Sequence, residues 1–515
     1  MPISFKLPEL ESNPILLAET RASKLNEFVR NLPFSDPMKA AADLSEELQI
    51  LNSQKTSYSN RLNALEIYRP AAIQITQALI PLFSYSKLPI SKNQKGYADA
   101  ASQVWEEMAF GYKWALIDLQ NKIININSDK SAALVIQRAI HALKETAFIS
   151  YLTYRAPARS LWAELHQLYY CALQQNAQAL IVNESLTDDN QSSVDSVYKE
   201  LLLLALAHPQ RLSGQELVRT SAYLTKIADD VELSTVGHVE SSTGVFLIEL
   251  DGNKPPTAYA RNIDTPNTET DLLMITVKLA KRIHTHLRLL KDDILPNDGS
   301  LPSNAVNSHY QDLLKHLITH IGKSPIRAFS RAKKNDGMEL GIGIHDAHYF
   351  SPKIGNDYKN LVVKSIAVKP SRWQILNVGA GGYALRKFNS SQASIQVGDI
   401  AVIKNNESLY WEIGVIRWAS INELNQLDIG FELIAPSAMP VTIKVPKRKD
   451  KIIGLLLPEI SALKQKTSFI IQRGECEPGE TLAFANDGIR NKVVVTELIE
   501  RTASFERYHY NLIEH

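Results

Sequence analysis

The sequence predicts an α+β protein with several domains, in which an all-α bundle or helical array precedes a β-barrel and a further small β domain. The chain has 515 residues, which exceeds the size that one hydrophobic core normally serves. Apolar residues recur at helical spacing over roughly the first 235 residues. After Met338, short β-branched runs alternate with turn residues. These two sequence patterns place the helical and the β regions in separate parts of the chain.

The change of pattern gives four predicted domains. Residues 1–235 form the helical domain, and 236–322 form a hairpin with connecting helices. Residues 323–440 form the barrel, and 441–515 form the additional β domain. The run Val445–Asp450 is expected to be an exposed linker, because four of its six residues are charged.

Helix signals are strongest near the N-terminus. Asp36 and Pro37 are an N-cap and a first helical residue, and Ala41, Leu44, Leu48 and Leu51 follow on one face. Ser213 and Glu216 form a capping box for a later helix. We expect the other helices at Leu62–Leu82, Ala98–Lys122, Ser131–Tyr151, Ala158–Val182, Val194–Ala207, Asp271–Leu290 and Tyr310–Ile321.

Strand signals begin with Thr243–Pro256, a β-branched and aromatic run that ends in turn residues and predicts a strand or a hairpin. From Met338 onward, many short strands without helices between them predict a small barrel. The strands after Pro440 predict a second barrel-like unit, with which we expect the Thr243–Leu250 hairpin to pack.

Composition excludes several classes of protein. A net charge of +1 argues against a protein that coats DNA or RNA, so we expect no nucleic-acid partner. Two cysteines, Cys171 and Cys476, make neither a disulfide framework nor a metal site. We find no signal peptide and no transmembrane segment, since polar residues and Pro81 interrupt the best candidate, Pro70–Ser86. We therefore expect a cytoplasmic protein.

The stretch Trp373–Leu385 resembles a ligand-binding turn. Gly379, Gly381 and Ala384 fit the loose fingerprint of a dinucleotide site, and Asp399 follows at the distance expected of a ribose-binding acid. That chemistry requires a helix to begin at the turn, because the helix N-terminus holds the pyrophosphate. The residues after Gly382 show no helical stripe and no cap. We therefore favour a tight turn in a β domain over an oxidoreductase.

The same stretch and the strands after it resemble the PilZ domain, the bacterial receptor module for cyclic di-GMP. The family's motif [D/N]-x-S-x-x-G corresponds to Asn377, Gly379 and Gly382, with Gly379 in place of the serine. The family's R-x-x-x-R motif corresponds to Arg327 and Arg331, just before the first barrel strand. The resemblance covers roughly Ser324–Pro436, about a fifth of the chain. It implies a PilZ-like β-barrel that binds cyclic di-GMP.

The motif residues suit that ligand. Arg327 and Arg331 carry guanidinium groups that can donate paired hydrogen bonds to phosphate oxygens or to guanine O6 and N7. Asn377 offers an amide to a guanine edge, and glycines let backbone amides approach closely. Lys333 and Lys334 are candidates for phosphate support, although a solvated charge run is the simpler interpretation. Between Lys323 and Lys444 there are 15 Lys/Arg against 10 Asp/Glu, which favours an anionic ligand.

No other group of residues predicts chemistry. His284 and His286 point to different faces of a helix and cannot share a metal. His345, Asp346 and His348 lie in a predicted strand, where His345 faces away from the other two. No nucleophile elbow, phosphate loop, zinc-protease helix or kinase motif is present. We expect no enzymatic activity, no metal and no cofactor.

Two functions stay open. In the first, the protein is a cyclic di-GMP receptor, and ordering of the Arg327–Arg331 segment changes how the preceding helices pack and signals to a protein partner through the N-terminal helices. In the second, it is a helical scaffold whose degenerate barrel binds no nucleotide.

Overall fold

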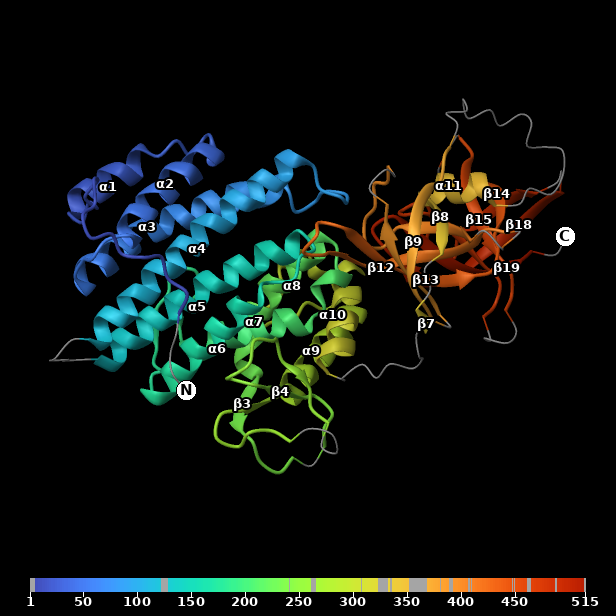
Figure 1. Ribbon diagram of the computed structural model, residues 1–515. Coiled ribbons are helices and arrows are strands. Elements are labelled where there is room, and N and C mark those ends of the chain that lie inside the picture. The colour runs from blue at the N-terminus through green and yellow to red at the C-terminus, as the bar shows by residue number, and fades with distance from the viewer. Residues whose placement is uncertain are drawn as a thin grey trace. The chain divides into compact units, whose positions relative to one another are not determined.

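The computed structural model describes residues 5–121, 128–239, 241–260, 265–306, 308–322, 332–333, 336–351, 368–379, 381–388, 392–405, 408, 410–446, 448, 450–460, 465–486 and 489–513. The chain forms two compact units. The first comprises Met1–Ser86, Ile90–Pro209 and Gly214–Ile326, and the second comprises Lys87–Pro89, Gln210–Ser213 and Arg327–His515. The predicted fold class, helices followed by β-barrels, is confirmed (Figure 1).

The first unit is mainly helical, and α2, α3, α4 and α5 lie in contact along their lengths (Figure 1). Asp36 accepts a hydrogen bond from Lys39 N with Pro37 at the start of α2, as predicted. The α-helices are α1 Ala22–Asn31, α2 Pro37–Asn52, α3 Tyr58–Leu79, α4 Lys92–Gln120, α5 Ser128–Leu152, α6 Arg159–Gln174, α7 Val194–Leu206, α8 Gly214–Ile227, α9 Val277–Lys291 and α10 Ser308–Ile321. Short 3-10 helices are Ile80–Leu82, Pro209–Arg211, Ala228–Asp230 and Ser303–Val306.

The predicted boundaries of α6 and α9 are wrong. Helix α6 ends at Gln174 and does not reach Val182, because Asn176 takes a positive φ of 50° that a right-handed helix excludes. Val182 instead belongs to the short hairpin of β1 Val182–Asn183 and β2 Gln191–Ser192. Helix α9 begins at Val277, and the apolar run before it is strand β6, Leu272–Ile275. A short buried apolar run fits either structure, so periodicity alone misassigned it.

A four-stranded antiparallel sheet completes the first unit. Its strands are β3 Glu232–Thr235, β4 Val245–Ile248, β5 Thr257–Ala258 and β6, in the order β3-β6-β4-β5. The predicted hairpin is confirmed, since β4 pairs with β5. On its other edge β4 pairs with β6 in this sheet. The expected packing of the hairpin with the C-terminal β domain stays a prediction.

The first barrel of the second unit closes through six strands in the order β8-β9-β10-β13-β12-β11, with β11 returning to β8 and β7 added to β9 (Figure 1). The strands are β7 Ala332–Lys333, β8 Gly337–Ile342, β9 Ser371–Gly379, β10 Gly382–Lys387, β11 Ile400–Asn405, β12 Glu412–Ile421 and β13 Leu427–Ala435. Helix α11, Gly343–Phe350, follows β8.

The assignment of His345, Asp346 and His348 to a strand is wrong, because they lie in α11. Gly343 takes a φ of 87°, which turns the chain out of β8. Asp346 then accepts a hydrogen bond from Ile342 N at 2.8 Å and fixes the start of the helix. In the described part of the chain, no group of three or more His, Cys, Asp or Glu is arranged to hold a metal ion.

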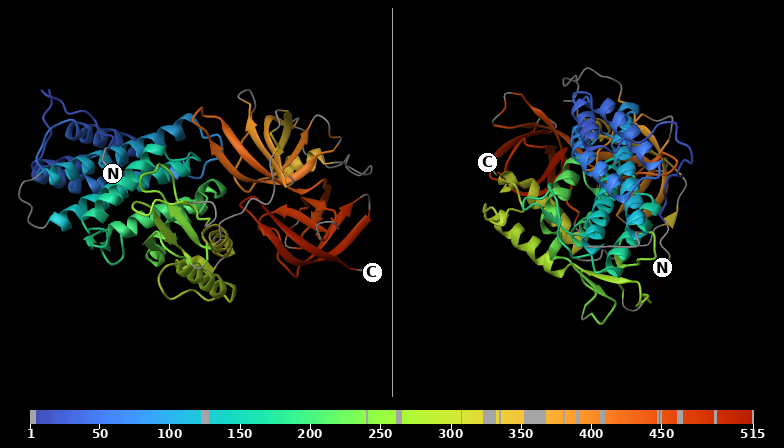
Figure 2. Two further views of the ribbon diagram at one scale, coloured as in Figure 1. Left: turned by 60° about the horizontal axis from the view of Figure 1, so that its bottom comes forward. Right: turned by 90° about the vertical axis from the view of Figure 1, so that its left-hand side faces the viewer.

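The second barrel, in red in the left view of Figure 2, is also closed by six strands, in the order β14-β15-β16-β19-β18-β17. They are β14 Met439–Lys444, β15 Ile452–Leu457, β16 Ser468–Gln472, β17 Thr481–Asn486, β18 Ile489–Arg501 and β19 Phe505–Leu512. Its interior is filled by apolar side chains such as Val441, Phe469 and Tyr508. The predicted second barrel-like unit is confirmed.

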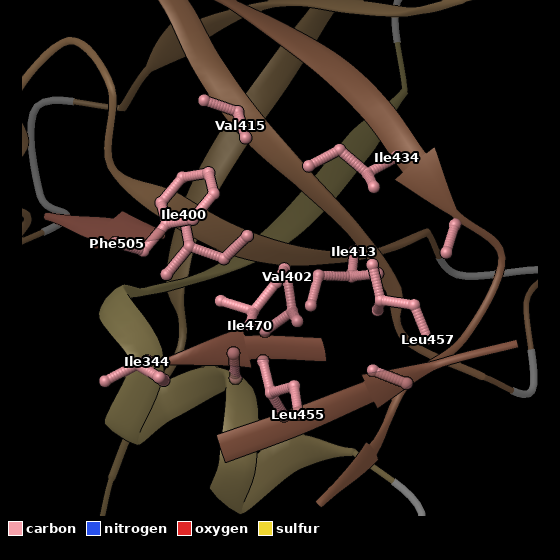
Figure 3. Close-up of a cluster of buried hydrophobic side chains, with 13 residues drawn as sticks. Ile344, Ile400, Val402, Ile413, Val415, Ile434, Leu455, Leu457, Ile470 and Phe505 are labelled. Carbon is pink, nitrogen blue, oxygen red and sulfur yellow. The ribbon is translucent and has the colours of Figure 1, made fainter. Parts of the chain in front are cut away.

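One apolar cluster joins the two barrels (Figure 3). Ile400 and Val415 on the first barrel pack with Leu455, Ile470 and Phe505 on the second, together with α11. All five side chains are at most 1% exposed. The burial of these five side chains shows that the two barrels pack directly against each other.

Over the described ranges, no helix combines the length and the apolar character that crossing a bilayer requires.

Candidate functional site

The predicted site residues lie around strands β7, β9 and β10. Arg327, Arg331 and Lys334 lie outside the described residues. Lys333 belongs to β7, where it pairs with Asn377 while Ala332 pairs with Val378. The two residues that directly follow the arginine motif in sequence therefore lie beside the asparagine of the second motif.

Gly379 and Gly382 face one another at the turn between β9 and β10. Gly382 has a φ of 147°, and a Cβ on it would overlap the carbonyl oxygen of Phe431 in β13. Gly381 O accepts a hydrogen bond from Leu433 N at 2.9 Å. Gly382 is thus required for close approach of β10 to β13, whatever else it does.

A β-bulge sets the direction in which Asn377 points. Ile375 pairs with Leu385, and Asn377 pairs with Ala384, so Leu376 is an extra residue in β9. Ile375 and Leu385 are almost fully buried inside the barrel. Ala384 follows the opposite face from Leu385, so Asn377 belongs with Ala384 on the outer face of the barrel.

The outer face continues across two more strands. Ala384 pairs with Gly430 in β13, and Gly430 pairs with Trp418 in β12. The Trp418 indole occupies the space that a side chain on Gly430 would fill. Asn377 and Trp418 are thus separated by three strand spacings, ~14 Å, and only small residues lie between them. We call this row of four paired residues the outer-face trough: Asn377, Ala384, Gly430 and Trp418.

Charged pairs border the trough. Arg386 holds Asp428 through two hydrogen bonds of 2.7 Å. Arg417, on the other side, pairs with Glu432 on this face and with Glu500 of the second barrel. Burial disfavours the charged form of Arg417, but Glu500 and Glu432 outweigh that effect and raise its pKa.

The dinucleotide-cofactor alternative has no structural basis here. Gly382–Lys387 is a strand, so no helix N-terminus meets the glycine turn. Asp399 is 7% exposed and accepts a hydrogen bond from Gln396 N at 2.8 Å.

The two histidines of α9 have different environments. The buried His286 ring contacts Tyr223 and Asp298, whereas His284 is exposed on another face of the helix.

Sequence reasoning missed Trp418 and Glu432 as members of this face. The alternation in "GFE" (430–432) marks Gly430 and Glu432 as neighbours on one side of a strand. Trp418 joins them only through a second bulge, which leaves Arg417 without a pairing partner between Ile416 and Trp418. The pairing register of β12 with β13 could not be predicted from the spacing of residues in the sequence.

Comparisons with known proteins agree with this architecture. Three family models describing parts of the cyclic-di-GMP receptor FimW match the chain in order. The N-terminal domain matches residues 23–238, the middle PilZ domain matches 245–365 and 364–440, and the C-terminal β-barrel domain matches 442–513. The chain is also 22% identical to the cyclic-di-GMP receptor FimW of Pseudomonas aeruginosa, over 99% of this chain and 94% of that protein. With a PilZ barrel preceded by a long helical region, the chain belongs to the PilZ-domain family.

Proposed function

We propose that this protein is a cyclic di-GMP receptor that binds its ligand on the outer face of the first barrel. The observation that carries the proposal is the pairing of β7 with β9, in which Lys333 lies opposite Asn377. Arg331 directly precedes this pair in sequence. The similarity to a cyclic-di-GMP receptor along almost the whole chain supports the same function.

The trough provides contacts of several kinds for such a ligand. In the proposed complex, Arg327 and Arg331 take the phosphates, with Lys333 and Lys334 as further positive charges. Asn377 donates to a guanine edge, and Gly379 and Gly382 leave room for the ligand to approach the backbone. Trp418, about half-buried over Gly430, offers an aromatic surface on which a base can stack.

Calorimetric titration of the full chain with cyclic di-GMP tests the proposal. We expect saturable binding by the natural protein and at least ~100-fold weaker binding by the Arg327→Ala/Arg331→Ala variant, because two charge-assisted contacts are lost. Lys444→Ala/Lys492→Ala is the matched control. It removes the same charge from exposed positions on the second barrel and leaves affinity unchanged. Equal affinities for all three proteins would refute the proposed site.

One observation favours the second candidate, a helical scaffold with a barrel that binds no nucleotide. Gly379 stands where the family motif has serine, and a hydroxyl donor is therefore absent. If the natural protein shows no heat of binding and no shift in melting temperature with cyclic di-GMP, this candidate replaces the first.

We further propose that the protein is not an enzyme, resides in the cytoplasm and signals through its helices to a protein partner. Cys171 and Cys476 are both free and buried, which fits a reducing compartment. Helix α10 ends at Ile321, whose carbonyl accepts a hydrogen bond from Thr276 at 2.7 Å, six residues before Arg327. Ordering of the arginine segment by ligand would restrain the chain next to this helix end. Hydrogen exchange in α10 that is identical with and without ligand would argue against this route.

A further inference from the structure

Glu432 occupies a distinctive position on the outer face of the first barrel. It lies directly opposite Gly382, one strand away from the glycine turn. Its side chain is 53% exposed. The backbone of β13 fills the space in which a side chain on Gly382 would lie, and the carboxylate of Glu432 stays accessible to solvent beside the turn.

Arg417 holds this carboxylate in one orientation. Arg417 Nε donates to Glu432 Oε2, while Arg417 Nη1 donates to Glu500 Oε1 on the second barrel. Glu500 is 15% exposed, so the guanidinium is anchored on the more buried side. Among the described residues, no hydrogen bond reaches the other oxygen of Glu432, Oε1. The carboxylate is thus oriented, partly neutralised and still able to accept.

Guanine is the base that such a carboxylate recognises. The Watson–Crick edge of guanine carries two adjacent donors, N1–H and the N2 amino group, which two carboxylate oxygens or one oxygen can accept. Adenine has an acceptor at N1, so the same carboxylate would face a lone pair. A phosphate near Glu432 would be repelled, which leaves the neutral base edge as the part of the ligand that fits.

Trp418 lies at the correct spacing to place that base. Its indole covers Gly430, which precedes Glu432 by two residues on the same face of β13. Two residues along a strand span ~7 Å, about the width of a purine and its hydrogen bond. A base in contact with the indole therefore presents its edge to the carboxylate.

We infer that Glu432, oriented by Arg417, is the residue that distinguishes guanine from adenine in the bound cyclic dinucleotide. The inference rests on the proposed function and adds a specificity-determining residue to it. Glu500 is then a positioning residue contributed by the second barrel.

The test compares affinities for cyclic di-GMP and cyclic di-AMP in the full-length protein. Glu432→Gln keeps the size of the side chain but replaces one acceptor oxygen with a donor. We expect ~10- to 100-fold weaker binding of cyclic di-GMP, the usual loss for a charge-assisted hydrogen bond, and a change of less than about threefold for cyclic di-AMP. Glu423→Gln, an exposed carboxylate in the turn between β12 and β13, is the matched control and leaves both affinities unchanged.

A second variant separates orientation from folding. Arg417→Lys preserves the charge but loses the fork that joins Glu432 to Glu500, so we expect partial loss of selectivity with an intact thermal transition. Unchanged selectivity in Glu432→Gln, with cyclic di-GMP still bound by the natural protein, overturns the inference and leaves the receptor function standing. Failure of the natural protein to bind either dinucleotide overturns both.

Discussion

The two barrels of the second unit have the same strand order, but their equivalent outer faces differ. One carries the outer-face trough, and the other is buried against the neighbouring barrel. Numbered from the first strand of each, both pair as 1-2-3-6-5-4 and close from 4 to 1. In the first barrel, Asn377, Ala384 and Gly430 of the outer-face trough lie on strands 2, 3 and 6 (β9, β10 and β13), and Trp418 lies on strand 5 (β12). In the second barrel, the equivalent strands β15, β16 and β19 carry Leu455, Ile470 and Phe505, which are buried against the first barrel.

The difference shows why the corresponding face of the second barrel is not open to a ligand. Its equivalent face is closed by strands β11 and β12 of the first barrel, through Ile400 and Val415. The contact is heterologous, because strands 4 and 5 of one barrel meet strands 2, 3 and 6 of the other. The exposed residues Lys492 and Thr496 lie on β18, the fifth strand of the second barrel.

The largest expected effect comes from placing a charge in the closed face. Ile470 is fully buried in the cluster between the barrels, so Ile470→Asp leaves an unpaired carboxylate there and should lower the free energy of unfolding by about 4 kcal/mol. Thr496→Asp, on the exposed face of β18, should change it by less than about 0.5 kcal/mol. Urea unfolding measures both. Similar values would mean that the two outer faces are not used differently.

The interiors of the barrels also differ in how buried carboxylates are paired. Glu506 in β19 is 2% exposed and accepts hydrogen bonds from Arg501 Nε at 2.6 Å and Gly474 N at 3.0 Å. Glu506→Gln removes the negative partner of Arg501, and we expect a loss of about 3 kcal/mol in unfolding free energy, as for other broken buried pairs. The same urea experiment measures it, and affinity for cyclic di-GMP serves as the control that should not change. A neutral effect on stability would show that Arg501 finds another partner.

Sequence patterns predicted the strands of both barrels but not how their faces are used. The run Ile400–Ile403 and the run Ile452–Leu457 have no polar alternation, which is the signature of a strand buried on both faces. That signal was available and would have predicted the contact between the barrels. By contrast, the position of Trp418 depends on the bulge at Arg417, and helix α11 depends on the positive φ of Gly343. Both features depend on tertiary structure, which the periodicity of the sequence does not encode.

Substitution of Trp418 tests whether the outer face of the first barrel binds the ligand. Trp418→Ala should weaken cyclic di-GMP binding by about 2 kcal/mol, or ~30-fold, if a base stacks on the indole. Tyr410 is an equally aromatic and 60% exposed residue before β12, and Tyr410→Ala should leave affinity unchanged. Tryptophan fluorescence during the titration offers a second measurement, since ligand should alter the emission of the natural protein and not that of Trp418→Ala. A full response in the variant would place the ligand elsewhere.

The smallest expected effect concerns Asp399, the buried carboxylate of the first barrel that contrasts with Glu506. Burial raises the pKa of Asp399, and the hydrogen bond from Gln396 N and the charge of Lys87 offset this effect only in part. A carboxyl group whose pKa is raised in the folded state contributes most to stability below its unfolded pKa, and the contribution is lost as pH rises through the folded pKa. Asp399→Asn should therefore stabilise the protein slightly at pH 7, because its amide oxygen can still accept from Gln396 N. The gain should shrink in urea unfolding as the pH is lowered, because Asp399 takes up its proton in the folded protein before it does so in the unfolded chain. A gain that grows on acidification would show that the folded protein stabilises Asp399 as the anion, and the expected penalty for burying its charge would be wrong.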